Sequence, residues 1–318
     1  MKPTILVTGG SGFVGRHLGL RLRDEYRVVL CARNQHQNLL SERYSGCASI
    51  PVDVSRIESI RDAVVETRPD VIIHAAATKY VDLGERQPLE CIDVNVRGSE
   101  NVARVAMERR VPIVLGMSTD KATPPIRNTY GMTKSLMERM FCTLDGQSDT
   151  TFLCTRFGNI AWSSGSVFPV WERMQKETGV IGTTGPDMRR FFFTVDEAVN
   201  VVHAAFTHAE ELHGCILGRR MKAALIRDVL ELWVKHRGGE WRQIEGRPGE
   251  RDDEYLIGDV ELAYAREAEF NGVPHYVISF HQRQERPLPL GLTSANAERL
   301  STEEIVEMIT GPVGLTRE

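Results

Sequence analysis

The amino-acid sequence predicts an α/β fold in which helices cover both faces of a doubly wound parallel sheet. Short apolar runs alternate with stretches of helical period, and a glycine-rich turn follows the first of these runs directly. Such alternation is typical of parallel strands that are buried on both faces. The chain has 318 residues, and because one core commonly needs ~100 to 200, a smaller second domain is also expected.

Five apolar runs are the predicted strands of the sheet, and each is separated from the next by room for a helix. They are residues 4–8, 27–32, 71–74, 111–117 and 151–156. After Gly158 this alternation breaks and glycine and proline recur, before a strand and a helix that are predicted within residues 191–210. The capping-box pattern at residues 301–304 predicts a last helix.

Composition excludes several classes of partner. Charged residues make up 26% of the chain and the net charge is -4, so there is no electrostatic reason to expect nucleic acid or an anionic membrane surface. The sequence shows no signal-peptide pattern and no apolar run of ~18 residues, which predicts a cytoplasmic protein without a membrane partner. Its six cysteines are widely spaced and form no C-x-x-C, so neither a metal site nor a redox pair is expected.

A glycine-rich turn, Thr-Gly-Gly-Ser-Gly-Phe-Val-Gly at residues 8–15, lies between the first strand and a helix. Gly9 permits the tight turn, Gly12 lets a pyrophosphate approach the backbone, and Gly15 lets the helix pack on the sheet. The other turn residues expected at the cofactor are Ser11, Phe13 and Val14. The larger domain is therefore predicted to be a Rossmann-type dinucleotide-binding domain.

This domain is predicted to span residues 1–158 plus about 191–215. Residues from about 159 to 190, together with 216–318, are expected to form a smaller mixed domain that binds the substrate. Glycine, proline and charged residues interrupt the strand–helix rhythm in both of these segments. The substrate is therefore expected between the two domains.

The end of the second strand favours NADP over NAD. The acidic residue that would hold the ribose hydroxyl of NAD is absent, and Arg33 stands there instead, where it could pair with a 2′-phosphate. The alternative is an ordinary solvated arginine. Asp53, followed by Val54, could accept a hydrogen bond from the adenine amino group, although an aspartate at a strand end is as often a helix cap.

Two segments carry the predicted catalytic groups. Tyr130 and Lys134 form Tyr-x-x-x-Lys on a predicted helix over residues 129–144, which puts both side chains on one face. The ammonium of Lys134 should lower the pKa of Tyr130 and make its phenolate a base for a hydroxyl. Thr119, Asp120 and Lys121 follow the fifth strand, where polar groups project into the crevice in which open sheets bind ligands. The alternative for Asp120 and Lys121 is a surface ion pair.

The sequence resembles the extended short-chain dehydrogenase/reductases. The features that carry this resemblance are the glycine turn, the two catalytic segments, Ala75, Ala76 and Ala77 after His74, and Asn95. The resemblance narrows to the UDP-N-acetylglucosamine 4,6-dehydratases of bacterial surface-sugar synthesis, in their short inverting branch. The motifs that carry it are Ser-Thr-Asp-Lys-Ala at 118–122, Tyr-Gly-Met-Thr-Lys at 130–134, Arg-Phe-Gly-Asn at 156–159, Gly-Ser-Val-Phe-Pro at 165–169, Met-Arg-Arg-Phe-Phe at 188–192 and Arg-Pro-Gly-Glu at 247–250.

This resemblance implies a route through a 4-keto sugar. Tyr130, helped by Thr119 and Lys134, takes the proton from the hydroxyl at carbon 4 while the hydride passes to NADP+. A neutral Lys121 then removes the proton from carbon 5, a protonated Asp120 donates to the hydroxyl that departs from carbon 6, and the hydride returns to carbon 6. Carbon 5 can be reprotonated with inversion. The resemblance also implies a homo-oligomer and places Ala75, Ala76, Ala77 and Asn95 at the cofactor.

Further residues are candidates for holding a UDP-sugar substrate. Arg190 and Arg247 are expected at the diphosphate because the guanidinium fork matches phosphate oxygens. The other candidates are Lys79, Asn159, Ser166, Val167 and Glu250. The chain departs from the family pattern in a loop one residue longer between Lys121 and Tyr130.

Two other functions remain open at this point. A nucleotide-sugar 4-epimerase or 4-ketoreductase needs the dinucleotide site, Thr119, Tyr130 and Lys134, but no acid–base pair at carbons 5 and 6. The presence of Asp120 and Lys121 speaks against it. A non-catalytic NADP-binding protein is the third option, and the intact Tyr130 and Lys134 speak against that one.

Overall fold

A nine-stranded sheet forms the centre of the molecule in the computed structural model, which describes residues 2–246 and 249–311. The strands lie in the order β14-β15-β10-β6-β5-β4-β1-β2-β3. Their bounds are β1 Thr4–Thr8, β2 Arg27–Ala32, β3 Ala48–Pro51, β4 Val71–His74, β5 Ile113–Met117, β6 Thr151–Arg156, β10 Cys215–Arg219, β14 Ala265–Phe270 and β15 Val273–Ser279. Strands β1 to β6 and β10 pair in parallel, whereas β15 and β14 are antiparallel additions at one edge.

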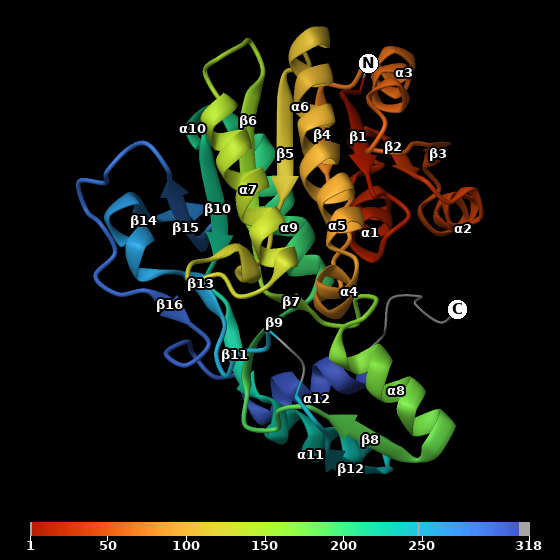
Figure 1. The fold of residues 1–318 in the computed structure, drawn as a ribbon, viewed down its shortest axis with the longest axis vertical. Coiled ribbons are helices and arrows are strands. Elements are labelled where there is room, and N and C mark those ends of the chain that lie inside the picture. Colours follow the sequence, from red (N-terminus) through yellow and green to blue (C-terminus); the bar gives the residue numbers. More distant parts are fainter. Residues whose placement is uncertain (1, 247–248, 312–318) are drawn as a thin grey trace.

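Helices cover both faces of this sheet (Figure 1). On one face α1 packs against α2 and α9, and on the other α6 packs against α3 and α7. Their bounds are α1 Phe13–Leu22, α2 Gln35–Ser45, α3 Ile57–Thr67, α6 Gly98–Arg109, α7 Thr129–Leu144 and α9 Val195–Thr207. Along β1, Ile5 and Val7 join one hydrophobic cluster and Leu6 the other. This alternation explains why the whole strand is apolar.

Short helices connect β4 to α6 along the rim of the sheet. They are α4 Val81–Arg86, α5 Pro88–Ile92 and a π-helical turn at Asp93–Arg97, while α10 Ala209–Leu212 follows α9. Turns of 3-10 helix occupy Asp120–Ala122, directly after β5, and Asp259–Tyr264. The first of these turns holds the predicted acid–base residues at the carboxyl end of the sheet.

A smaller lobe lies beyond that end of the sheet, at the bottom of Figure 1. It contains a three-stranded sheet in the order β11-β9-β7 and the strand pair β12-β8, while a further pair, β13-β16, lies between β14 and β11 in Figure 1. The bounds are β7 Asn159–Ile160, α8 Val167–Thr178, β8 Val180–Thr183, β9 Arg189–Phe193, β11 Lys222–Leu225, α11 Ile226–Arg237, β12 Glu240–Gln243, β13 Tyr255–Ile257, β16 Leu292–Thr293 and α12 Thr302–Thr310. Buried rings of Trp162, Phe168 and Trp233 pack together in its core.

The division of the chain between the lobes differs from the predicted one in two places. Strand β9 pairs with β7 and β11 in the smaller lobe, although the helix that follows it, α9, packs on the main sheet as predicted for residues 191–215. Strands β14 and β15 extend the main sheet, whereas residues 216–318 were predicted for the smaller domain. Both differences depend on pairing between distant segments, which the local hydrophobic pattern does not encode.

A buried ion-pair cluster joins β6 and α7 to the 3-10 turn at Asp259–Tyr264. Arg156, at the end of β6, donates hydrogen bonds to Glu138 of α7 and to Glu261, with nitrogen–oxygen distances between 2.7 and 2.9 Å. Its side chain is 1% exposed. It also donates to the carbonyl of Leu256. Leu256 and Glu261 follow Glu254, which lines the cleft described next.

Candidate active site

Two adjoining cavities lie where the main sheet meets the smaller lobe. The first, of about 410 Å³, opens at the carboxyl ends of β1, β4, β5 and β6. The second, of about 260 Å³, is lined by both lobes. They share the residues Lys79, Tyr80, Lys121, Asn159, Ile160, Gly165 and Ser166. The cavities therefore form two halves of one cleft, with Lys121 and Asn159 at the junction.

The glycine turn forms the floor of the first cavity. Gly9 has a φ of +69°, and a Cβ there would lie 2.6 Å from the backbone nitrogen of Ala76. A Cβ on Gly15 would lie 2.5 Å from the Cα of Gly10. Gly12 caps α1 without a side-chain hydrogen bond, so the helix presents its first N–H groups to the cavity. The predicted lining residues Gly9, Ser11, Gly12, Phe13, Val14, Gly15, Ala75, Ala76 and Ala77 all line it, and this bare backbone cradle fits a pyrophosphate.

Arg33 and Asp53 lie at the ends of β2 and β3, as predicted. Arg33 is exposed, and its nearest charged partner is Glu90, at 3.7 Å. One carboxylate oxygen of Asp53 accepts hydrogen bonds from the backbone N–H and the hydroxyl of Ser55, at 3.0 and 2.7 Å. Asp53 thus holds a local turn with Ser55, and the N-cap of the following helix α3 is Arg56 and not Asp53, while Arg33 is exposed to solvent.

Asn95 and Val54 support the cofactor half of the cleft from behind. The side-chain oxygen of Asn95 accepts from the N–H of Thr78 at 2.7 Å, and its nitrogen donates to Thr133 at 2.9 Å. Its amide therefore fastens the segment after β4 to α7 instead of facing a ligand. Val54 is buried, and a Cβ on Gly98 would lie 2.8 Å from its side chain.

Tyr130, Lys134 and Thr119 line the first cavity together, as the spacing predicted. Helix α7 begins where Asn128 accepts a hydrogen bond from the N–H of Gly131 at 2.8 Å, which places Tyr130 in the first turn. Burial raises the pKa of Tyr130 to about 12, partly opposed by the charge of Lys121 and a hydrogen bond with Thr119. The sequence predicted a lowered pKa for Tyr130. The pKa is raised instead, because burial outweighs the nearby cation.

The ammonium of Lys134 has a different partner from the predicted one. Its Nζ donates to the sulfur of Met137 at 3.1 Å. Burial lowers the pKa of Lys134 to about 8. Lys79 lines both halves of the cleft and is exposed. Of these two lysines, Lys134 is the one whose charge costs desolvation energy.

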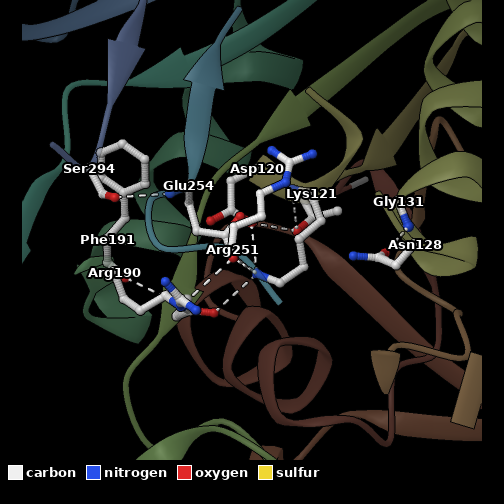
Figure 2. A network of polar contacts seen from close by, with 12 residues as sticks. Asp120, Lys121, Asn128, Gly131, Arg190, Phe191, Arg251, Glu254 and Ser294 are labelled. Carbon is white, nitrogen blue, oxygen red and sulfur yellow. Dashed lines mark hydrogen bonds and ion pairs between the residues drawn. The ribbon is translucent and has the colours of Figure 1, made fainter. Parts of the chain in front are cut away.

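Lys121 is surrounded by oxygen atoms at the junction of the cavities (Figure 2). Its Nζ lies 3.0 Å from Oδ1 of Asp120, 3.4 Å from Oε1 of Glu254 and 3.4 Å from Oδ1 of Asn159. Burial disfavours the ammonium, but the carboxylates of Asp120 and Glu254 outweigh burial and raise the pKa of Lys121 above its usual range. The expectation of a neutral Lys121 is wrong for this arrangement, because two carboxyl groups and not other cations surround it.

The pKa of Asp120 is shifted in the direction that the predicted proton donor needs. Asp120 is fully buried, and burial raises its pKa against the opposing effect of Lys121. The hydroxyl of Thr119 donates to its Oδ1 at 2.9 Å. Its other oxygen, Oδ2, is buried without a hydrogen-bond partner. Asp120 is therefore suited to donating a proton.

Two charged residues that sequence reasoning missed complete the cluster. Glu254 is 4% exposed, and its Oε1 lies 3.8 Å from Nε of Arg190. Arg251 is 6% exposed and donates to the carbonyl of Pro125. Both follow the Arg-Pro-Gly-Glu motif within four residues, so their proximity to that motif was the signal that could have identified them.

The remaining substrate candidates occupy the second cavity. Ser166, Val167, Arg190 and Glu250 line it, and Glu250 accepts a hydrogen bond from the hydroxyl of Thr184 at 2.9 Å. Arg190 donates to the backbone carbonyls of its neighbour Arg189 and of Asp252. Arg247 lies outside the described residues.

Fold and site together define an enzyme of the extended short-chain dehydrogenase/reductase class that modifies nucleotide sugars. The chain belongs to the polysaccharide biosynthesis protein family, whose model matches residues 5–272. It is 30% identical to the UDP-glucose 4-epimerase of Rickettsia bellii, an alignment that covers 97% of this chain and 96% of the relative. Across the described part of the chain, every helix is too short or too polar to cross a lipid bilayer.

Solved structures share the fold over most of the chain. The structure of Pen from Bacillus thuringiensis superposes with a TM-score of 0.88 at 26% identity and covers 97% of both chains. The NAD-dependent NDP-hexosamine 5,6-dehydratase TunA, from tunicamycin biosynthesis, has a TM-score of 0.70 at 20% identity, covering 81% of this chain and 88% of that one. The predicted parallel, doubly wound α/β architecture is thereby confirmed.

Proposed function

We propose that this protein is an NADP-dependent 4,6-dehydratase of a UDP-sugar, with UDP-N-acetylglucosamine as the substrate and inversion at carbon 5 as a further outcome of the same chemistry. The observation that carries the proposal is the pairing of Asp120 and Lys121 at the junction of the two cavities. Oxidation at carbon 4 needs Tyr130, Thr119 and Lys134. Elimination of water needs an acid–base cluster in addition, and the junction supplies one.

The residues of the first cavity fit the cofactor. NADP+ would, when bound there, accept the hydride from carbon 4 and return it to carbon 6. Gly9, Gly12 and the start of α1 would hold its pyrophosphate, and Arg33 its 2′-phosphate. Tyr130 would accept the proton of the carbon 4 hydroxyl, since the positive charge of Lys121 stabilises the developing phenolate.

The second cavity fits the nucleotide part of the substrate. Arg190 lines it and is 13% exposed at the side chain, so its guanidinium can still reach an anionic ligand. Ser166 begins α8, and its hydroxyl is buried without a hydrogen-bond partner. A diphosphate placed between Arg190 and the start of α8 would leave the sugar at Lys121 and Asn159.

A 4-epimerase is the second candidate, because the Rickettsia relative carries that name and aligns over nearly the whole chain. An epimerase returns the hydride to carbon 4 and has no use for a proton donor toward carbon 6. The buried, partnerless Oδ2 of Asp120 and its raised pKa favour the dehydratase. The name of TunA, a dehydratase of the same fold, shows that this fold accommodates dehydration.

The test of the function is incubation with UDP-N-acetylglucosamine and a panel of other nucleotide sugars, followed by mass spectrometry. A product lighter by one water is expected, and Tyr130→Phe should form neither this product nor bound NADPH. An isomer of unchanged mass would support the epimerase, and no turnover of any sugar would contradict both proposals.

Arg33 provides the test of cofactor choice. Calorimetry should show that NADP+ binds more tightly than NAD+. Arg33→Ala should weaken NADP+ binding by roughly 10- to 100-fold, because it removes a charge-assisted hydrogen bond worth about 1.5–3 kcal/mol. Binding of NAD+ should not change. If NAD+ binds more tightly to the wild type, the assignment of NADP is incorrect.

We expect a cytoplasmic homo-oligomer. Apolar side chains of Leu89, Ile92, Met132 and Leu136 are 43–76% exposed on α5 and α7, which pack against each other. Exposed apolar side chains on two neighbouring helices support self-association.

A further inference from the structure

Two buried carboxyl groups share one lysine at the junction of the cavities. Oδ1 of Asp120 and Oε1 of Glu254 both lie within 3.4 Å of Nζ of Lys121. Each group has a second oxygen, Oδ2 of Asp120 and Oε2 of Glu254, that is buried without a hydrogen-bond partner. Each carboxyl group thus has one oxygen whose capacity to accept or carry a proton is not used by the described protein groups.

Lys121 itself has no means of accepting a proton in this arrangement. An ammonium has three N–H donors and no lone pair. Its three acceptors are Asp120, Glu254 and Asn159. A lysine between two carboxyl groups acts as their common counter-ion, and the proton-accepting atom of the cluster must lie on one of its partners.

The environments of the two carboxyl groups differ in charge. Lys121 is the main charged partner of opposite sign for Asp120, with a weaker interaction with Arg251, and Glu254 repels it. Burial opposes ionisation of Glu254, but Lys121, Arg190 and Arg251 together outweigh burial and lower its pKa. Divergent environments of this kind assign the acid and base roles of a carboxyl pair. Of the two, Asp120 is the weaker acid and suits the role of proton donor, and Glu254 is the stronger acid and suits the role of proton acceptor.

We propose that Glu254, with Lys121 as its fixed counter-ion, is the general base that removes the proton from carbon 5 of the 4-keto sugar. This inference rests on the proposed dehydration and replaces Lys121 as the base. Glu254 lines the substrate half of the cleft, and its Oε2 is the free acceptor.

The elimination balances with these groups. The carbon 5 proton moves to Oε2 of Glu254, its electron pair forms the double bond between carbons 5 and 6, and the bond from carbon 6 to oxygen breaks. The proton of Asp120 joins the departing hydroxide to form water. After carbon 6 is reduced, Glu254 returns its proton to the same face of carbon 5 and retains the configuration, whereas inversion takes a solvent proton on the opposite face and leaves Glu254 to release its own proton to solvent. The proton released earlier from the carbon 4 hydroxyl restores Asp120 through solvent.

The test uses deuterium exchange at carbon 5 of the 4-keto product in D₂O. That carbon is adjacent to the ketone, so exchange needs the base but no net redox turnover. Glu254→Gln should slow exchange by ~100- to 10,000-fold at every pH, the usual effect of removing a general base. It should still form bound NADPH on addition of the sugar. Asp253→Asn is the matched control, because Asp253 pairs with Arg189 and Ser294, and its exchange should match that of the wild type.

Lys121→Met distinguishes the two possible bases. With Glu254 as the base, exchange persists in this variant, but the pH at which it is lost on acidification rises, because the carboxylate has lost its nearest cation. With Lys121 as the base, Lys121→Met abolishes exchange at every pH. Glu254→Gln then retains exchange, and the pH at which exchange rises moves to a lower value, because Lys121 loses its proton more easily without that carboxylate. This second pattern overturns the proposal. Should Glu254→Gln fail to fold, Lys121→Met decides alone.

The outcome for Glu254 is separable from that for the proposed function. A wild-type protein that forms no dehydrated sugar refutes the dehydratase. A wild-type protein that dehydrates, combined with normal exchange in Glu254→Gln, refutes only the role of Glu254.

Discussion

His74 shows how a titratable residue can serve the scaffold. It is fully buried at the end of β4, where Nδ1 lies 2.8 Å from the hydroxyl of Thr8 and Nε2 lies 3.0 Å from that of Ser99. Burial, with a smaller effect of Lys134, lowers its pKa to about 3. The imidazole is therefore neutral at neutral pH and connects β1, β4 and α6 beneath the cofactor cradle.

The stability of the protein should depend on pH through His74. Between about pH 6.5 and 3 the unfolded chain binds a proton that the native protein does not, so stability falls as the pH drops through this window. At pH 4.5 the loss should be roughly 2–3 kcal/mol. His74→Asn should be less stable at pH 7.5, and its difference from the wild type should narrow at pH 4.5. Thermal melting measures both values, and parallel curves for the two proteins would contradict this account.

The sequence alone identified Asp120 and Lys121 as site residues, but it did not predict their protonation states. The protonation state of Lys121 depends on Glu254, which the chain brings to it from a distant segment. Likewise, the pKa of Tyr130 is dominated by burial, which depends on the packing of both lobes. Residue types and spacing fix which chemistry is available, whereas the tertiary surroundings decide the direction of each proton transfer.

Among the elements, the turn between β1 and α1 is specified almost wholly by its glycines. Gly12 has an ordinary φ of -72° and lines the cavity, and a Cβ there would lie 3.1 Å from the carbonyl oxygen of Gly9. The backbone can therefore accept alanine with a small adjustment. The methyl group of the alanine would occupy space in the cavity from which a phosphate would approach the backbone.

Gly12→Ala should accordingly separate binding from folding. We expect NADP+ affinity to fall by about tenfold or more, since the methyl group occupies the approach to the backbone N–H groups, while the melting temperature changes little. Gly218→Ala is the control, because its nearest neighbour would lie at an ordinary 3.6 Å. Fluorescence titration of both variants gives the comparison, and unchanged affinity in Gly12→Ala would show that the cradle does not hold the phosphates.

The bounds of four predicted strands of the main sheet are confirmed. Residues 4–8, 27–32, 71–74 and 151–156 have the predicted bounds, but β5 begins at Ile113 and not at Val111. The N–H of Val111 bonds to the carbonyl of Ala106, and Pro112 has no N–H to donate. The place of β9 in the smaller sheet was not predictable from local pattern, because an apolar strand fits either sheet equally well.

For the whole molecule, the cluster of Arg156, Glu138 and Glu261 links the main sheet and α7 to the 3-10 turn at Asp259–Tyr264. Removing the arginine leaves two buried carboxyl groups without their counter-ion. Arg156→Ala should therefore lower the free energy of unfolding by about 3–5 kcal/mol. Urea denaturation gives this value.

Arg104→Ala is the control for that measurement. Arg104 pairs with Glu100 on the surface of α6, and its side chain is 66% exposed, so its loss should cost no more than about 0.5 kcal/mol. Equal effects of the two substitutions would mean that the buried cluster contributes no more than a surface pair.

A chain leaving the ribosome delivers β6 well before β10, the strand that pairs with its outer edge. Until residues 215–219 emerge, that edge presents unpaired N–H and C=O groups and is open to wrong pairing. Glu254 and Glu261 emerge later still. The glycine turn can thus form early in synthesis, whereas the cleft acquires its last carboxylates only when four-fifths of the protein has been made, so a nascent chain has the phosphate cradle long before it has the complete acid–base cluster.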